Sequence, residues 1–476
     1  VFLWINNGKT KEDKENFFTI NNVTFKNRKT IKKYYGHIEE WDVSKITNME
    51  NLFRVKEEII RAYRGVNLRE MNNNTDFHYD LSKWDVSNVK NMEGMFIGCD
   101  KFEGNGLEKW VVSNVTNMNN MFHCCRSLTG KTLENWDVSN VETMGGLFDE
   151  CYKLNCNLNK WNVSNVKNMT GLFSYCQEFN SDFSKWDVSN ITNISWMFES
   201  CIQFTGKGLD KWNVSNVKNM EGTFYECNKL NTDLSKWDVS NVTSMYWMFK
   251  NCNNLDFVTS WNVSNVKNMA QMFENCYNFD ADLGKWNVSN VYDMRQMFEN
   301  CINFKGKNLN NWNISNVRII NSMFINCEMF NGDLGNWDVS NVIKITNMFA
   351  NCINFTGKNI HKWNVSNVIS MKGMFDNCPK FTGYGLNKWN VSNVDNMSYM
   401  FSKCKNLKSK NVEKWDVSNV SRMSYMFSHC TNLNGKYLEN WDISKVQFME
   451  GLFYKCYKLN CNLNKWNVSN VISMND

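Results

Sequence analysis

Apolar residues recur along the chain in one fixed pattern. The stretch Trp84 to Cys99 reads WDVSNVKNMEGMFIGC, and close variants of it follow to the end of the chain. Counted from the tryptophan as zero, valine or isoleucine occupies positions +2 and +5, methionine or isoleucine +8, phenylalanine +12 and cysteine +15. After a first gap of 43 residues the tryptophans are spaced by 24 to 26, at positions 41, 84, 110, 136, 161, 186, 212, 237, 261, 286, 312, 337, 363, 389, 415, 441 and 466. This period predicts a solenoid of about seventeen stacked coils.

Two periodicities within each unit predict two kinds of element. Around the tryptophan, L-x-x-W-x-V alternates with period two and is rich in β-branched and aromatic residues, which favours a short strand. Positions +5, +8, +12 and +15 are then separated by 3, 4 and 3, which is helical spacing, and the serine at +3 is a suitable N-cap. We therefore expect an α/β solenoid with a parallel sheet on one face and short helices on the other. All length variation lies between the cysteine and the next tryptophan, as expected of a surface loop.

The repeat also predicts the domain organisation. Residues 1–40 form a non-repeat or capping segment, and residues 41–83 a divergent first repeat with a charged insertion at 54–80. Residues 84–476 form the regular solenoid, which ends in mid-repeat at WNVSNVISMND. We interpret the chain as a piece of a longer protein, because solenoids normally end in polar capping units.

Composition narrows the class of partner. Of the 476 residues, 42% are hydrophobic, so the repeat region has ample material for a core. The 53 basic and 48 acidic side chains are interspersed, which does not resemble a nucleic-acid footprint. No apolar run approaches the roughly 18 residues that a membrane span needs.

The cysteines follow the repeat. Fifteen of the 18 occupy +15, the exceptions being Cys124, Cys156 and Cys461. We expect a column of buried thiols beside a column of buried tryptophans. The first regular coils supply the predicted core residues Trp84, Trp110, Trp136, Trp161, Cys99, Cys125, Cys151 and Cys176. No C-x-x-C pair suggests zinc. The segment CYKLNCNLNKWNVSNV occurs twice, so Cys151 with Cys156 and Cys456 with Cys461 are either local bridges or a trace of duplication.

Polar columns flank the tryptophan. Position +1 is aspartate in eight units, asparagine in eight and valine only at Val111, while position −1 is lysine in eleven. Both are expected to point outward, as a solvated face or as a polar surface for glycan or protein. Since aspartate replaces asparagine freely, we do not expect dense N-glycosylation at the N-V-S sequons.

Position +10 carries a second candidate surface. On a helical wheel it lies away from the apolar stripe. Four units have large aromatic residues there: Trp196, Trp247, Tyr399 and Tyr425. Exposed aromatic clusters are typical interface anchors, so we predict partner binding at these residues. The alternative is that they cover a neighbouring loop.

The repeat resembles that of the BspA-like leucine-rich-repeat proteins, and within them the mycoplasma-lipoprotein-type surface repeat. Trp237 to Cys252, WDVSNVTSMYWMFKNC, is nearly a copy of that motif, and Tyr35 to Trp41, YGHIEEW, is similar to the start of such arrays. The resemblance covers about residues 35–476. It implies a leucine-rich-repeat-like solenoid with a role in surface adhesion or interaction.

No catalytic motif or cofactor signature accompanies the repeat, and the five histidines fall in unrelated positions. We therefore expect no enzyme, no cofactor and no metal. The predicted function is a non-catalytic scaffold at the cell surface or outside the cell. Its partners would be protein or glycan on another cell or particle, or neighbouring subunits, without nucleic acid or a membrane span. The alternative is a structural component of a larger assembly, such as a giant-virus particle or a surface layer. The many unpaired thiols favour that alternative, because they suit a reducing compartment.

Overall fold

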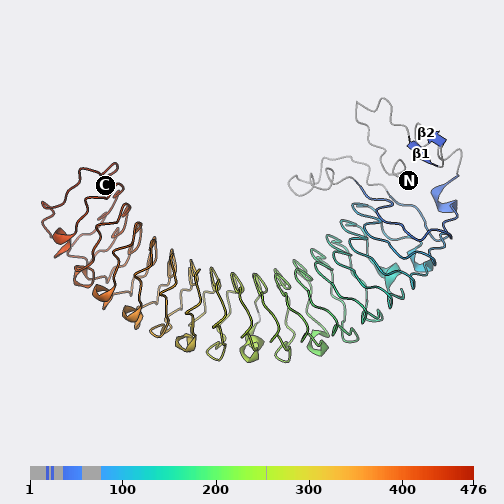
Figure 1. Ribbon diagram of the computed structural model, residues 1–476, viewed down its shortest axis with the longest axis horizontal. Helices are drawn as coiled ribbons and strands as arrows, with labels where there is room; N and C mark the ends of the chain where they lie inside the picture. The colour runs from blue at the N-terminus through green and yellow to red at the C-terminus, as the bar shows by residue number, and fades with distance from the viewer. Residues whose placement is uncertain (1–17, 21–22, 26–35, 56–76, 254, 476) are drawn as a thin grey trace. The chain divides into compact units, whose positions relative to one another are not determined.

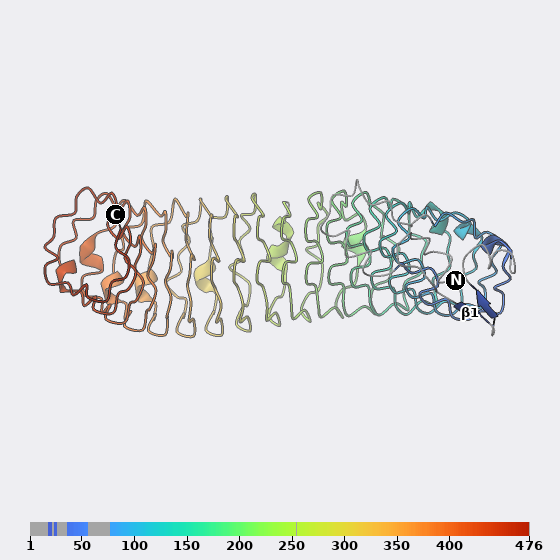
Figure 2. The same ribbon diagram turned by 90° about the horizontal axis from the view of Figure 1, so that it is seen from above.

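The computed structural model describes residues 36–55, 77–253 and 255–475, together with the backbone of residues 18–20 and 23–25. The chain forms two compact units, Val1–Trp237 and Asp238–Asp476. Within each unit the coils follow one another side by side in chain order (Figure 1). In the view from above, the coils of the second unit are narrow loops that run across the direction of stacking (Figure 2). The solenoid expected from the repeat is therefore confirmed.

Regular secondary structure is short. Strands β1 (Phe18–Ile20) and β2 (Val23–Phe25) form an antiparallel pair in which Phe18 lies opposite Phe25. The other elements in the described part of the chain are 3-10 helices, most of which lie directly before a repeat tryptophan. They are η1 (Ile38–Glu40), η2 (Leu107–Lys109), η3 (Lys131–Leu133), η4 (Leu209–Lys211), η5 (Asp256–Ser260), η6 (Leu309–Asn311), η7 (Ile360–Lys362), η8 (Leu386–Lys388), η9 (Ser409–Asn411) and η10 (Leu438–Asn440).

Neighbouring coils are joined by a ladder of backbone hydrogen bonds at positions +7 to +14. Parallel bridges connect the residues at +7, as between Asn91 and Asn117. The N–H groups at +8, +10, +12 and +14 donate to carbonyls of the following coil; for example, Phe96 donates to Met121 over 2.8 Å. The predicted parallel pairing thus lies after the tryptophan, at +7, whereas the tryptophan segment is extended but is joined to its neighbours by side chains. At Trp110 its φ and ψ are −73° and 133°.

The stretch from +8 to +15 is a run of three turns, and the prediction of a helix there is wrong. In the coil of Trp84, Met95 donates to Met92, Ile97 to Gly94 and Cys99 to Phe96, each between residues three apart. Positions +10 and +14 have positive φ, as at the third residue of type II turns. The N–H groups that an α-helix would need are already bonded to the next coil. Serine at +3 therefore caps no helix, and the described residues contain none of the α type.

Three side-chain ladders tie most described coils to the one before. The indole N–H of the tryptophan donates to the carbonyl at −3, as Trp110 does to Leu81 over 3.0 Å. The amide of asparagine at +4 donates to the carbonyl of the serine at +3, and the thiol at +15 donates to the carbonyl of the phenylalanine at +12. The carbonyls at −3 and +12 thus accept a second hydrogen bond beside the one from a backbone N–H of their own coil, so the buried indole and thiol donors are paired inside the stack, where an unpaired polar group would be costly.

The interior is filled by columns of rings. The indoles of Trp84 and Trp110 stack at 6.4 Å with 4° between their planes, and the rings of Phe96 and Phe122 stack at 5.5 Å. Trp84, Trp110, Trp136 and Trp161 are buried, as are Cys99, Cys125, Cys151 and Cys176. Each coil therefore gains its core by stacking on the next.

Asparagine forms a further ladder at +14 in the second unit. The amide of each residue donates to the side-chain oxygen of the one before it over 2.5–2.9 Å, through Asn251, Asn275, Asn300, Asn326, Asn351 and Asn377. All six have positive φ, between 55° and 64°. Asparagine tolerates this conformation better than other residues with a side chain.

The loops vary as the sequence predicts. In the longer form, Gly208 precedes η4 with φ of 88°, and a Cβ there would lie 2.3 Å from the backbone nitrogen of Ser184. Most of the predicted N-terminal segment 1–40 and of the insertion 54–80 lies outside the described residues. Across the described ranges, no helix has the length and apolarity that crossing a bilayer requires.

Candidate functional site

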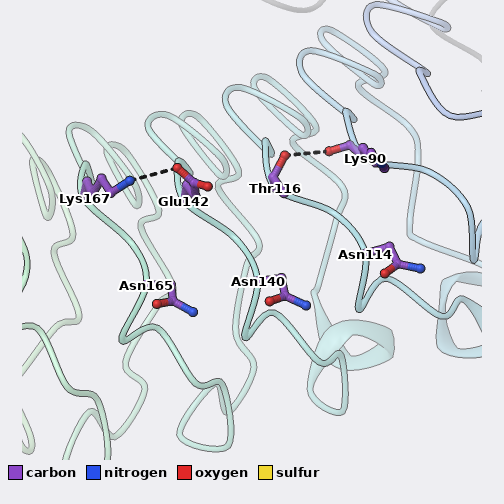
Figure 3. Close-up of a pocket in the computed structure, with 7 residues that line it drawn as sticks. All are labelled: Lys90, Asn114, Thr116, Asn140, Glu142, Asn165 and Lys167. Atoms are coloured by element: carbon purple, nitrogen blue, oxygen red, sulfur yellow. Dashed lines mark hydrogen bonds and ion pairs between the residues drawn. The ribbon is translucent and has the colours of Figure 1, made fainter.

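A polar groove lies on one face of the first unit. It has a cavity volume of about 440 Å³ and is lined by residues at +4 and +6 of successive coils: Lys90, Asn114, Thr116, Asn140, Glu142, Asn165 and Lys167. All seven are exposed. Figure 3 shows Asn114, Asn140 and Asn165 in a row, one per coil, with the +6 side chains beside them. The lining of the groove, an asparagine at +4 beside a residue at +6, therefore repeats from coil to coil. We call it the groove row.

Backbone and side-chain hydrogen bonds between coils fix the spacing of the groove row. The N–H of Thr116 donates to the carbonyl of Lys90, Glu142 to Thr116 and Lys167 to Glu142, over 2.9–3.0 Å. The amides of Asn114, Asn140 and Asn165 donate over 2.6–2.8 Å to serine carbonyls of the preceding coil. Each asparagine is thereby held with its amide nitrogen bound, which leaves its side-chain oxygen as an acceptor.

The charges in the groove are of both signs. Glu142 and Lys167 form an ion pair of 2.9 Å, and the Thr116 hydroxyl donates to the Lys90 carbonyl over 3.2 Å (Figure 3). Because these side chains are exposed, the ion pair contributes little stability and can exchange its partner for a ligand. Amide oxygens, ammonium groups and a carboxylate bind polar groups of a partner, and the groove contains no nucleophile beside a base.

Two other hollows involve the columns beside the tryptophan. One is lined by Thr205, Lys207, Asp210, Asn231, Thr232, Asp233 and Lys236, and the other by Thr259, Ser260, Trp261, Asn262, Asp282, Gly284, Lys285, Asn287, Asn308 and Asn311. The Asp or Asn side chain at +1 also makes a hydrogen bond within its own coil. Its oxygen accepts the backbone N–H of the serine at +3, as in Asp85 to Ser87 over 3.0 Å and Asn162 to Ser164 over 3.2 Å. Both residue types supply that oxygen, which explains their interchange.

The aromatic residues at +10 lie on the turns rather than on a helix. Trp196 is half-buried over the next coil, since a Cβ on Gly222 would lie 2.2 Å from its ring. Trp247 stacks on Tyr246 and lies under the ammonium of Lys250 at 4.7 Å. Tyr399 and Tyr425 stack at 5.1 Å with 15° between their planes, and Tyr399 is 38% exposed. The structure thus brings the two tyrosines together, and it also gives Trp196 a covering contact.

The thiols are all free. Seventeen are buried and Cys461 is partly exposed, so neither Cys151 with Cys156 nor Cys456 with Cys461 forms a bridge. Burial raises the pKa of the column thiols well above its usual range. A thiol that donates to a carbonyl and resists ionisation is chemically inert.

Cys124 belongs to a buried polar cluster that the sequence did not reveal. Its sulfur lies 3.4 Å from the His123 ring and 3.4 Å from Glu150, while His123 pairs with Asp149 at 3.0 Å and Arg126 with Glu150 at 2.6 Å. Burial, followed by the charge of Glu150, raises the pKa of Cys124. The thiol is 1% exposed, so the cluster joins two coils and offers no open nucleophile.

Sequence reasoning also missed the groove. Its signal was the asparagine at +4, which follows the serine in nearly every repeat beside a variable +6 residue. A constant polar residue next to a variable one is typical of a scaffold position beside a recognition position. The helical interpretation concealed this, because it placed +4 in a first helical turn.

Comparison with known proteins gives a family and several solenoids. The family model described as "Mycoplasma protein of unknown function, DUF285" matches residues 19–131, 125–207, 192–307, 293–405 and 383–476. No curated protein matches the chain. Among solved structures, a leucine rich cell surface protein from Faecalibacterium prausnitzii matches with 17% identity and a TM-score of 0.27, over 50% of this chain and 75% of that chain.

Two further solved structures are similar at a lower level. A leucine-rich-repeat protein from Leptospira interrogans has 8% identity and a TM-score of 0.16, over 89% of this chain and 98% of its own. The functional domain of InlJ from Listeria monocytogenes, which includes a cysteine ladder, has 10% identity and a TM-score of 0.15, over 66% of this chain and 65% of its own. Because the TM-scores of these solved structures are low, only the match to the family model shows which family the chain belongs to.

Proposed function

Since this chain belongs to the family described as Mycoplasma protein of unknown function, DUF285, we propose that it is a non-catalytic scaffold that binds other macromolecules at the cell surface or outside the cell. An adhesion role is the finer form of this proposal. The partner is a protein or glycan on another cell or particle. The resemblance to BspA-like surface repeats supports it.

The observation that carries the proposal is the groove row. Asn114, Asn140 and Asn165 present the same acceptor at each coil, and the +6 residues beside them differ in charge from coil to coil. A rigid row of equal acceptors favours an extended partner that meets several coils at once, since simultaneous weak contacts add to a useful affinity.

The test is protease shaving of the intact native source, cell or particle, with mass spectrometry of the released peptides. A scaffold at the surface releases peptides from the repeats while an internal marker protein stays intact. Repeat peptides that emerge only after lysis or disassembly contradict the surface role.

A structural component of a larger assembly is the second candidate. It is favoured by the thiol ladder, in which each +15 sulfur must keep its hydrogen to donate to a carbonyl, as Cys276 does to Phe249. Such a core is easiest to maintain in a reducing compartment. Release of repeat peptides only on disassembly is the result expected from this candidate.

A further inference from the structure

The +14 position changes character near the end of the second unit. From Asn251 to Asn377 it carries the asparagine ladder, whose amides bond to one another. The next three coils carry Lys403, His429 and Lys455 there, again with positive φ of 61°, 59° and 56°. The same backbone therefore presents basic groups to solvent in place of mutually bonded amides.

The same three coils also carry exposed tyrosines, one of which contacts the basic groups. Tyr399 and Tyr425 stack at +10. Tyr454 meets the His429 ring edge-on at 5.3 Å, and the Lys455 ammonium lies 5.0 Å over the Tyr454 ring. Tyr454 is 38% exposed and Tyr457 76%. We call the set Tyr399, Lys403, Lys405, His429, Tyr454, Lys455 and Tyr457 the tyrosine–lysine patch.

The lysines of the patch form no close ion pair, although the charge of Lys403 acts on the half-buried Asp376. Across the described residues, the ammonium groups of Lys403, Lys405 and Lys455 have no carboxylate within 4.0 Å, in contrast to Lys250 with Glu274 and Lys305 with Asp280. Partial burial, followed by the charges of Lys455, Lys403 and Lys405, lowers the pKa of His429. Asp376, on which the charge of Lys403 acts, also accepts a hydrogen bond from Ser402, and Glu450 accepts one from Ser424.

Exposed aromatic rings with unneutralised cations form a surface suited to an anionic partner that also has apolar side chains. We propose that the tyrosine–lysine patch docks an acidic segment of a partner protein, its carboxylates meeting Lys403, Lys405 and Lys455 and its apolar side chains lying on the tyrosine rings. The inference rests on the proposed role as an interaction scaffold and names the chemistry of one partner.

The test measures binding of a fluorescein-labelled peptide of alternating glutamate and tyrosine to the full chain by fluorescence polarisation. The triple variant Lys403→Gln, Lys405→Gln, Lys455→Gln is expected to bind about tenfold more weakly and with less dependence on salt. The matched control is Lys344→Gln, Lys362→Gln, Lys388→Gln, which removes the same charge from the same unit at exposed positions outside the patch and the described hollows, and keeps the affinity. Replacement of the three patch lysines by arginine is expected to restore binding.

Tyr457→Ser tests the aromatic part, because that side chain is so exposed that its removal leaves the fold intact; affinity is expected to fall about threefold. Equal affinity of the patch and control triple variants overturns the proposal. So does tighter binding of polyuridylate than of the peptide, which assigns the patch to nucleic acid. Neither result affects the shaving experiment, so failure of this proposal is distinguishable from failure of the surface role.

Discussion

At position +1 a single side-chain oxygen determines which residues the repeat accepts. Aspartate and asparagine both accept the N–H of the serine at +3, whereas Val111 has no oxygen to offer Ser113. The sequence showed the interchange of aspartate and asparagine at +1. It could not show the acceptor's partner, because an oxygen two residues before a serine fits a turn and an outward-facing strand equally well.

Val111→Asp is expected to stabilise its coil by about 0.5–1 kcal/mol, the net value of one hydrogen bond. Val111 is 56% exposed, so little apolar contact is lost. Hydrogen exchange of the Ser113 amide measures the effect and should slow about two- to fivefold. Asp137→Val is the reverse control and should speed exchange at Ser139. Unchanged exchange in both variants contradicts the role given to the +1 oxygen.

Cysteine reactivity is also decided at single residues. Cys156 and Cys461 occupy the same place in the duplicated segment CYKLNCNLNKWNVSNV, yet Cys156 is buried and Cys461 is partly exposed. We expect a thiol reagent to modify Cys461 in the native protein and all eighteen thiols in guanidinium. Burial raises the pKa of Cys461, so its rate should still increase with pH where that of free cysteine has levelled off.

The matched variants are Cys461→Ser, which should abolish native labelling, and Cys156→Ser, which should leave it unchanged. Rapid native modification of several +15 thiols would be incompatible with the buried column.

At the level of the element, sequence and structure differ most between +8 and +15. The inward-facing residues were predicted correctly: Met92, Phe96 and Cys99 are all fully buried. Their 3-4-3 spacing arises from successive turns as readily as from a helix, since a turn also brings residues three apart to one side. A helix and a run of turns differ in which carbonyls accept the backbone N–H groups. Here the acceptors belong to the next coil, and the pattern of a single repeat does not show contacts between coils.

The glycines and asparagines at +10 and +14 are the sequence feature that argues against a helix between +8 and +15. Positions +10 and +14 are often Gly or Asn, residues that are poor within helices and good at positive φ. Tyr175, Ser200 and Lys403 at +14 obscured it, because the inter-coil bonds hold them in a conformation that their side chains disfavour.

Asn326 separates the two tasks of the +14 position, namely backbone conformation and the amide ladder. Asn326→Gly keeps the backbone free and loses two side-chain bonds of 2.6 Å, at a cost of about 1–2 kcal/mol. Asn326→Ala adds the strain of positive φ and should cost about 2–4 kcal/mol. Urea unfolding with hydrogen exchange in the adjoining coils measures both. Equal losses would show that the φ of 62° is not enforced.

At the scale of the whole molecule, stability is the sum of many equal small terms. Hydrogen bonds from Ser87, Ser189 and Ser340 lower the pKa of Asp85, Asp187 and Asp338. A carboxylate with a lowered folded-state pKa stabilises the fold above its unfolded value of about 3.9 and loses that effect as the pH falls through the folded value. The array should therefore weaken in acid below about pH 4 in proportion to its aspartate coils.

The triple variant Asp85→Asn, Asp187→Asn, Asp338→Asn keeps the accepting oxygen and removes the titration. It should match the parent protein near neutral pH and lose less stability between about pH 4 and pH 2. Urea unfolding at several pH values measures the difference. Replacement of the exposed Glu103, Glu108 and Glu178 by glutamine removes the same charge and should leave the acid loss unaltered. An equal acid loss in both triple variants would mean that net charge, rather than the turn at +1, governs it.

The likeness of every inter-coil contact has an evolutionary consequence. Most described coils offer their successor the same carbonyls at −3, +3 and +12, and meet their predecessor with the same indole, amide and thiol donors. Recombination between two repeats that deletes or duplicates whole coils rejoins matching surfaces without a mismatch in the core. The duplicated segments Cys151–Val166 and Cys456–Val471 fit such a history. A lineage could thus change the reach of the array, and the number of recognition positions that it displays, without first inventing a new fold.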